Sequence, residues 1–356
     1  MGIRKKMKYD VATLKNLIRE SATFKEKFEN IMSLILKDLS IVVLAVLFIS
    51  TLNRFFGAEN SAAAVVIFCI FMFVKSVDFG YNMKSSIFSL FIIFMALTFG
   101  TYYSGIVNPA LGFIINIISV GIIALLGCQQ PIYGSAGLFL FGYVFMYSNP
   151  VSDYMFKLRV MEMAAGFIIC ATVFYINHRK KLGNESLLKL IKGYSIFYDL
   201  GKYHLQIVLG LSLSLFIGEM FNLPRVLWVG CACMSVVSQY GKEPVGRFIE
   251  RLIGVVIGSV IFTFVYMYTP DSLKLMLGLF SGFCLGLCST YKWSTAFNSF
   301  GALLVATEIY GLRSSVIMRV GNNLIGCIFG FVFYYAFHKF MEFIEGSKSD
   351  NLVEDL

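Results

Sequence analysis

Long apolar stretches alternate with short polar breaks along almost the whole chain. Each stretch approaches the roughly 20 apolar residues that a helix needs to cross a bilayer. The pattern therefore predicts an all-α polytopic membrane protein with 12 transmembrane helices. The predicted stretches are Leu39–Phe55, Ala62–Val77, Ile87–Tyr103, Ala110–Gly127, Tyr133–Tyr147, Leu158–Ile176, His204–Phe221, Val226–Ser238, Phe248–Tyr266, Leu273–Cys288, Trp293–Tyr310 and Val316–Phe337.

The composition agrees with a membrane protein. Hydrophobic residues make up 58% of the 356 residues and charged residues only 14%, whereas about 25% of a soluble domain is charged. This excludes a soluble globular protein. The eight cysteines lie in or beside apolar stretches without the spacing of a metal or redox motif, so we expect no disulfide framework, metal site or cofactor.

Positive charges set the orientation, because lysine and arginine are enriched in cytoplasmic loops. With a cytoplasmic N-terminus, 23 of the 30 lysines and arginines fall on inside segments and seven on outside segments. The distribution predicts a cell inner (plasma) membrane protein with both termini cytoplasmic. The predicted domains are a cytoplasmic amphipathic helix (1–38), a first six-helix repeat (39–178), a cytoplasmic linker (179–202), a second six-helix repeat (203–340) and a cytoplasmic tail (341–356).

The two halves show a weak internal repeat. A shift of 160 residues aligns Cys128–His178 with Cys288–His338 without a gap, and eight of 51 positions are identical. The pairs include Arg159 with Arg319 and His178 with His338, although the chain has only three histidines. Because each half has six predicted spans, the repeats share one orientation, which predicts a pseudo-twofold axis along the membrane normal.

Arg247, Arg251, Gly254 and Gly258 share one face of a predicted helix. The glycines let a neighbouring helix approach closely. Two arginines four residues apart repel each other unless an anion lies between them, and near the membrane this points to an anion path. The alternative is that both arginines pair with nearby acids such as Glu243 and act as topology signals.

The same spacing recurs at Arg319, Asn323, Gly326 and Gly330, and the first half has Arg159 at the matching position. Arg159 and Arg319 are predicted near the outer ends of their helices. A guanidinium can bind a planar carboxylate through two parallel hydrogen bonds. Snorkelling of both side chains to the outer headgroups is the alternative.

Two acids and two tryptophans add candidate roles. Glu162 and Glu308 lie within predicted spans, where a carboxyl group is a candidate proton carrier; pairing of Glu162 with Arg159 is the alternative. Trp228 and Trp293 are candidates for stacking on an aromatic substrate, with anchoring at the membrane interface as the alternative. No nucleophile–base pair stands out, so the sequence does not indicate an enzyme.

The Leu223–Gly258 segment resembles the fusaric acid resistance and aromatic acid exporter family of membrane transporters. The resemblance rests on Trp228 after a proline-led helix start and on Arg247-x3-Arg251-x2-Gly254-x3-Gly258. That family is also similar to the aluminium-activated malate channels of plants. The resemblance implies export of small organic anions, typically aromatic carboxylates, across the inner membrane.

The leading hypothesis is therefore an efflux transporter for organic carboxylate anions, with proton coupling as a candidate driving force. A passive anion channel similar to the malate channels is the alternative. The expected partners are the lipid bilayer and small organic anions, with a second copy of the chain as a further candidate and no nucleic acid.

Overall fold

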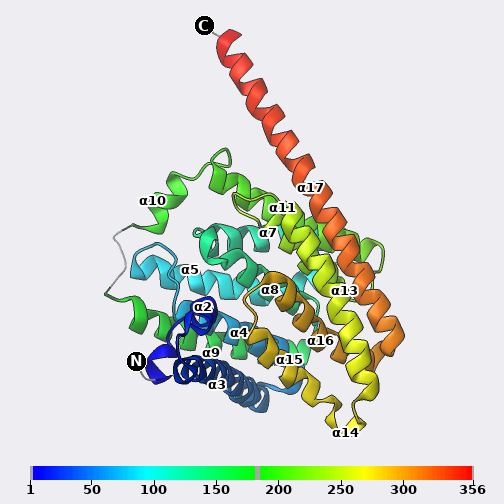
Figure 1. The fold of residues 1–356 in the computed structure, drawn as a ribbon. Coiled ribbons are helices and arrows are strands. Elements are labelled where there is room, and N and C mark those ends of the chain that lie inside the picture. The colour runs from blue at the N-terminus through cyan, green and yellow to red at the C-terminus, as the bar shows by residue number, and fades with distance from the viewer. Residues whose placement is uncertain (1–2, 181–184, 355–356) are drawn as a thin grey trace. The chain divides into compact units, whose positions relative to one another are not determined.

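The computed structural model describes residues 3–180 and 185–354, and in these ranges all regular secondary structure is helical (Figure 1). The helices are α1 (Ile3–Lys6), α2 (Val11–Glu20), α3 (Phe24–Phe56), η1 (Ala58–Asn60), α4 (Ser61–Val74), α5 (Met83–Met95), η2 (Ala96–Gly100), α6 (Thr101–Ile106), α7 (Pro109–Gly127), η3 (Pro131–Tyr133), α8 (Ser135–Tyr147), α9 (Asp153–His178), α10 (Leu187–Lys192), α11 (Asp199–Met220), α12 (Val226–Val237), α13 (Val245–Tyr268), α14 (Asp271–Lys274), α15 (Met276–Gly286), α16 (Tyr291–Tyr310) and α17 (Leu312–Glu354).

Each of the twelve predicted apolar stretches lies largely within helices of this structure. Polar side chains define several helix starts. Asn82, Asn108 and Ser152 each accept a hydrogen bond from a backbone N–H in the first turn of the following helix. Pro109 occupies the first helical position of α7, where its missing N–H costs nothing.

The protein is a multi-pass membrane protein by the length and composition of its helices. Among the described residues, seven helical segments are long and apolar enough to cross a bilayer, and the number twelve stays a prediction. The seven segments are Phe24–Phe56, Met83–Ile106, Pro109–Gly127, Asp153–His178, Asp199–Met220, Val245–Tyr268 and Leu312–Glu345. Three shorter apolar segments are Ala58–Val74, Ser135–Tyr147 and Val226–Val237.

The chain divides into two compact units. The first unit comprises Met1–Ser50 and Ile249–Gly321, and the second comprises Thr51–Phe248 and Asn322–Leu356. These units do not follow the two predicted repeats, because the first span is grouped with helices of the second half. Positions 181–184 of the predicted linker and the extreme ends of the predicted terminal segments lie outside the described residues.

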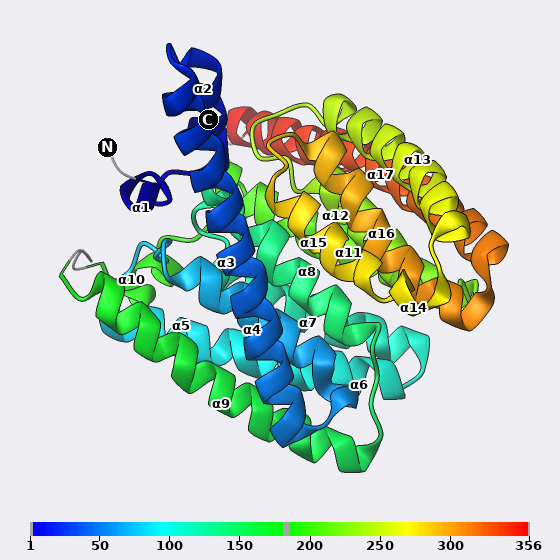
Figure 2. The ribbon, with the colours of Figure 1, turned by 60° about the horizontal axis from the view of Figure 1, so that its bottom comes forward.

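Helices of both halves pack together in the second unit. Helix α4 packs on α8 and α9, α5 on α7 and α9, α7 on α11, and α8 on α12 (Figure 2). Helix α9 approaches α4 closely at Gly166, where an added Cβ would lie 2.6 Å from Ile67 Cδ1. The α17 residues of this unit approach α12 in the same way. A Cβ at Gly326 would overlap the carbonyl oxygen of Val229, and one at Gly330 would lie 3.1 Å from Cys233 Cα.

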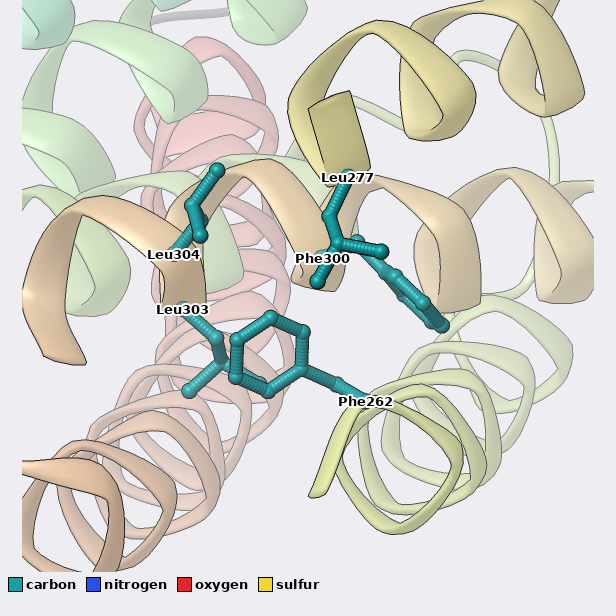
Figure 3. Close-up of a cluster of buried hydrophobic side chains, with 5 residues drawn as sticks. All are labelled: Phe262, Leu277, Phe300, Leu303 and Leu304. Atoms are coloured by element: carbon teal, nitrogen blue, oxygen red, sulfur yellow. The ribbon is translucent and has the colours of Figure 1, made fainter. Parts of the chain in front are cut away.

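The first unit has its own hydrophobic core between α13, α15 and α16. Phe262 packs edge to face on Phe300, and Leu277, Leu303 and Leu304 complete the buried cluster (Figure 3). This core fixes α13 against α16.

The N-terminal segment folds back on the start of α3. The Lys6 ammonium lies 3.3 Å from a Glu29 carboxylate oxygen, Asn30 donates a hydrogen bond to the carbonyl of Leu17, and the Leu14 side chain of α2 is fully buried. Helix α3 begins at Phe24 and continues past residue 38 without a break. The predicted amphipathic helix of residues 1–38 is therefore divided into α1, α2 and the start of α3, and α3 continues into the first predicted span.

The most informative test of the twelve-span count lies around α14 and α15. Together they rise roughly 24 Å, enough for a short crossing. Ser272, the second residue of α14, and Thr290, four residues after the end of α15, are both exposed. In a cysteine-depleted background, a membrane-impermeant maleimide should label Ser272→Cys from outside the cell and Thr290→Cys only in inverted vesicles. Labelling of both from one side would show that this segment does not cross.

Candidate anion-binding site

Glycine positions helix α13 against helix α16. A Cβ added at Gly254 would lie 2.5 Å from the carbonyl oxygen of Lys292, and one added at Gly258 would overlap the carbonyl oxygen of Ala296. Any side chain at these two positions would push the helices apart. The close approach expected from the glycine spacing is therefore present, and the neighbouring helix is α16.

Arg251 lies one turn before this glycine contact and faces the same helix. Its side chain is buried, with 7% of its surface exposed, and Nη1 donates a hydrogen bond of 2.9 Å to the hydroxyl oxygen of Tyr291, the first residue of α16. The phenol holds the guanidinium in place and leaves its charge intact.

Arg319 reaches α16 from α17. It is 3% exposed, and Nη2 lies 3.4 Å from the hydroxyl oxygen of Ser299, to which it donates a hydrogen bond. Tyr291 and Ser299 are eight residues apart, so their Cα atoms are separated by roughly 12 Å along the helix axis. Arg319 is the eighth residue of α17, near the predicted outer end of that helix, and its guanidinium binds a residue near the middle of α16.

This arrangement suits the binding of an organic anion. Two buried guanidinium groups from different helices are attached to one helix at two depths, and Tyr291 and Ser299 are neutral hydrogen-bond partners. A guanidinium has five N–H donors in a planar fork. This fork matches the two oxygens of a carboxylate, which it can bind with charge-assisted hydrogen bonds.

The third candidate arginine lies in the second unit. Arg159 of α9 is 2% exposed; Nε donates to Asn60 Oδ1 at 3.1 Å and Nη1 donates to the carbonyl of Asn149 at 3.0 Å. Glu162, one turn further along α9, is fully buried, and neither carboxylate oxygen has a hydrogen-bond partner among the described residues. The two charges act on each other electrostatically, but no direct salt bridge joins them.

Part of the chain is similar to a known protein family. Residues 213–333 match the family described as "Fusaric acid resistance protein-like". Over these residues the match agrees with the resemblance to fusaric acid resistance proteins, and similarity to the malate channels stays a prediction. The matched segment contains Arg251, Tyr291, Ser299 and Arg319. No curated protein and no solved structure matches the chain.

The remaining predicted residues differ in their surroundings. Trp228, at the start of α12, and Asn323, on α17, are buried. Trp293 is 43% exposed, with the Lys292 ammonium 5.7 Å from the centre of its ring. Glu308 is exposed near the end of α16, and Arg247 is half-buried on α13.

Sequence reasoning missed several polar residues that hold the arginines. Ser299, Asn60 and Asn149 lie within or beside apolar stretches and form no motif. It also missed a cavity of about 380 Å³ in the second unit, which Lys202, Lys242, Tyr240, Glu243 and His338 help to line. The polar run from Gln239 to Pro244, which interrupts two apolar stretches, was the available signal for this cavity.

The α13–α16 contact predicts opposite effects for two glycine substitutions. Gly258→Ala should lower stability by about 1–3 kcal/mol, because its new methyl group overlaps backbone. The matched control is Gly282→Ala on α15, where nothing lies within 4 Å of an added Cβ. It should be neutral or stabilise by up to about 1 kcal/mol through helix propensity. Thermal unfolding of the purified variants in detergent measures both, and equal melting temperatures would argue against a tight contact.

Proposed function

We propose that this protein is an efflux transporter in the inner (plasma) membrane that exports small organic carboxylate anions, aromatic ones in particular, with both termini in the cytoplasm. One observation carries the proposal. Two buried arginines from α13 and α17 are bound to the same helix, within the segment that matches the fusaric acid resistance protein-like family.

The cost of these charges supports a functional role. Burying an arginine among membrane-spanning helices costs free energy, which rises to about 2.5–3.5 kcal/mol at the centre of a helix on insertion scales. Hydroxyl groups such as those of Tyr291 and Ser299 recover part of this cost. A carboxylate substrate supplies the negative charge that the hydroxyls lack, and its two oxygens match the planar fork of a guanidinium. Arg251 lies near the predicted cytoplasmic end of its helix and receives the anion first, and Arg319 binds it further along α16.

Corresponding contacts support two parallel six-helix repeats. In the first half, Cys170 Sγ lies 3.8 Å from the carbonyl oxygen of Ile67, which joins α9 to α4. In the second half, Gly330 meets Cys233, which joins α17 to α12. Cys170 and Gly330 are equivalent under the shift of 160 residues. The sixth helix of each repeat therefore packs on the second helix at an equivalent position.

Proton coupling is part of this proposal, with Glu162 as the proton carrier. Its carboxyl group is buried without a hydrogen-bond donor, and protonation would remove a charge that is costly to bury. Glu308 is a weaker candidate because it is exposed. A passive channel would need neither carboxyl group.

Replacement of Arg251 should impair export. Arg251→Ala should lower efflux of benzoate from inverted or reconstituted vesicles by about tenfold or more, because charge-assisted hydrogen bonds of roughly 1.5–3 kcal/mol each are lost. Arg251→Lys should restore only part of the rate, since lysine keeps the charge but not the fork. The matched control is Arg313→Ala, which removes an exposed arginine of α17 and should leave efflux unchanged. Normal export by well-expressed Arg251→Ala protein would leave Arg251 a structural or topological residue.

Glu162→Gln should uncouple export from the proton gradient. The amide keeps the size of the side chain but cannot gain or lose a proton. We expect benzoate accumulation driven by a pH gradient to fall about tenfold or more, while protein-dependent benzoate exchange without a gradient persists. Glu59→Gln, which changes an exposed glutamate without an assigned role, is the control and should retain coupling. Wild-type protein that only equilibrates benzoate, whatever the pH gradient, would identify a passive channel instead.

A further inference from the structure

Asp38, a residue without a role so far, lies in an unusual position in the first unit. It belongs to α3, at the predicted cytoplasmic end of the first span, and only 4% of its surface is exposed. A Cβ added at Gly286, the last residue of α15, would overlap the Asp38 carboxylate. The carboxyl group therefore occupies the space that the missing side chain of Gly286 leaves free.

The surroundings of Asp38 disfavour a negative charge. Oδ2 is enclosed and has no hydrogen-bond partner among the described residues. The group also sits at the C-terminal end of α15, where the helix dipole and the last backbone carbonyls are themselves negative. The titratable groups that interact with it electrostatically are the thiols of Cys284 and Cys288, and the Lys15 ammonium acts on the Cys288 thiol as well.

Lys15 brings a positive charge to the end of α15. It belongs to α2, and its ammonium donates a hydrogen bond of 3.2 Å to the hydroxyl oxygen of Ser289, three residues after the end of α15. Lys15 also acts electrostatically on the Cys288 thiol, as Asp38 does. The ammonium and the carboxyl group therefore both act on the Cys288 thiol, and the ammonium is held three residues after the end of α15.

The other half of the chain places a titratable side chain at the equivalent position. Ile67 and Cys233, the two residues that meet the sixth helices, are 166 residues apart, six more than the shift of 160 that relates the sixth helices themselves. For the earlier helices this structural shift of 166 carries Asp38 onto His204. His204 is 2% exposed on α11, and its Nε2 lies 3.1 Å from the carbonyl oxygen of Cys128 at the end of α7. Histidine can donate a hydrogen bond to a carbonyl oxygen at the end of a helix. An aspartate can do so only when it is protonated, because an ionised carboxylate has no donor.

We infer that Asp38 is a proton-binding site that takes part in coupling export to the proton gradient, and this inference rests on the proposed function. In the packed state of the structure the carboxyl group is neutral. The proton on Oδ2 then makes this oxygen a hydrogen-bond donor, which suits a position beside the last backbone carbonyls of α15. When Asp38 releases this proton to the cytoplasm, the carboxylate is left facing the end of α15 and attracts the Lys15 ammonium. The charge change acts on the packing of α3 and α15, so proton release and helix movement are linked. A sodium ion fits the site less well, because hard cations prefer several oxygen ligands and the neighbours here include two thiols.

Chemical modification tests the protonated state without any transport. Dicyclohexylcarbodiimide reacts with protonated carboxyl groups in apolar surroundings, and mass spectrometry of the purified full-length protein locates the adduct. We expect Asp38 to be modified in acidic buffer and progressively less as the pH rises. In Lys15→Met, modification should persist to higher pH, because the carboxylate loses its nearby positive charge. Absence of an Asp38 adduct at every pH, or an adduct yield that does not change with pH, would overturn the inference.

Reconstituted protein tests the coupling. Asp38→Asn mimics the neutral acid. It should reduce benzoate accumulation driven by a pH gradient about tenfold or more, while benzoate exchange without a gradient stays within about twofold of wild type. Asp271→Asn removes an exposed aspartate of α14 and serves as the matched control with normal coupling. Asp38→Glu is the second variant, in case the asparagine protein does not reach the membrane, and should retain pH-driven accumulation.

The outcomes separate this inference from the proposed function. If Asp38→Asn protein keeps pH-driven accumulation, the coupling role of Asp38 is overturned. If the variant loses benzoate exchange as well as accumulation, the role of Asp38 is structural and the inference is also overturned. Accumulation driven by a sodium gradient but not by a pH gradient would replace the proton with sodium. Absence of any benzoate transport by wild-type protein contradicts the proposed function, whereas the modification experiment still decides whether Asp38 binds a proton.

Discussion

The cost of burying a guanidinium charge within membrane-spanning helices constrains the arrangement of α13, α16 and α17. Arg251 and Arg319 are almost fully buried. In both helices the residues three and four positions after the arginine, towards the glycines, are not acidic. Each arginine instead reaches α16 and donates a hydrogen bond to a hydroxyl oxygen. A hydroxyl orients a guanidinium and carries no negative charge of its own, so this contact does not compete with the charge of an anion. A permanent carboxylate partner would compete with that charge.

Close backbone contact makes this arrangement possible. Gly254 and Gly258 let α13 lie directly against the backbone of α16, which brings the Arg251 side chain within reach of Tyr291. Gly166 and Gly326 produce the same kind of contact in the second unit. In a bilayer, where apolar side chains gain little by leaving lipid, such small-residue contacts are a principal source of helix association. The glycines therefore determine which helices the arginines can reach.

The sequence was sufficient to predict the helices and the contact face of α13, but not to predict which helix packs against that face. Apolar periodicity predicted the helices, and the spacing of Arg251, Gly254 and Gly258 predicted a close helix contact. Periodicity defines a face without naming the helix that covers it, so the attachment of Arg319 to the middle of α16 could not be foreseen. Asp38 was missed for a related reason. It lies where a charged segment meets an apolar one, and only the folded chain shows that Gly286 leaves room for its carboxyl group.

Equilibrium binding of radiolabelled benzoate to the purified protein tests most directly whether Arg251 and Arg319, the two arginines that contact α16, form an anion site. We predict saturable binding to wild-type protein and about tenfold or greater weakening in both Arg251→Ala and Arg319→Ala, which corresponds to the loss of at least one charge-assisted hydrogen bond in each. Arg313→Ala should bind as wild type does. Equal affinity of wild-type, Arg251→Ala and Arg319→Ala proteins would contradict the account, because the anion would then bind elsewhere in the molecule.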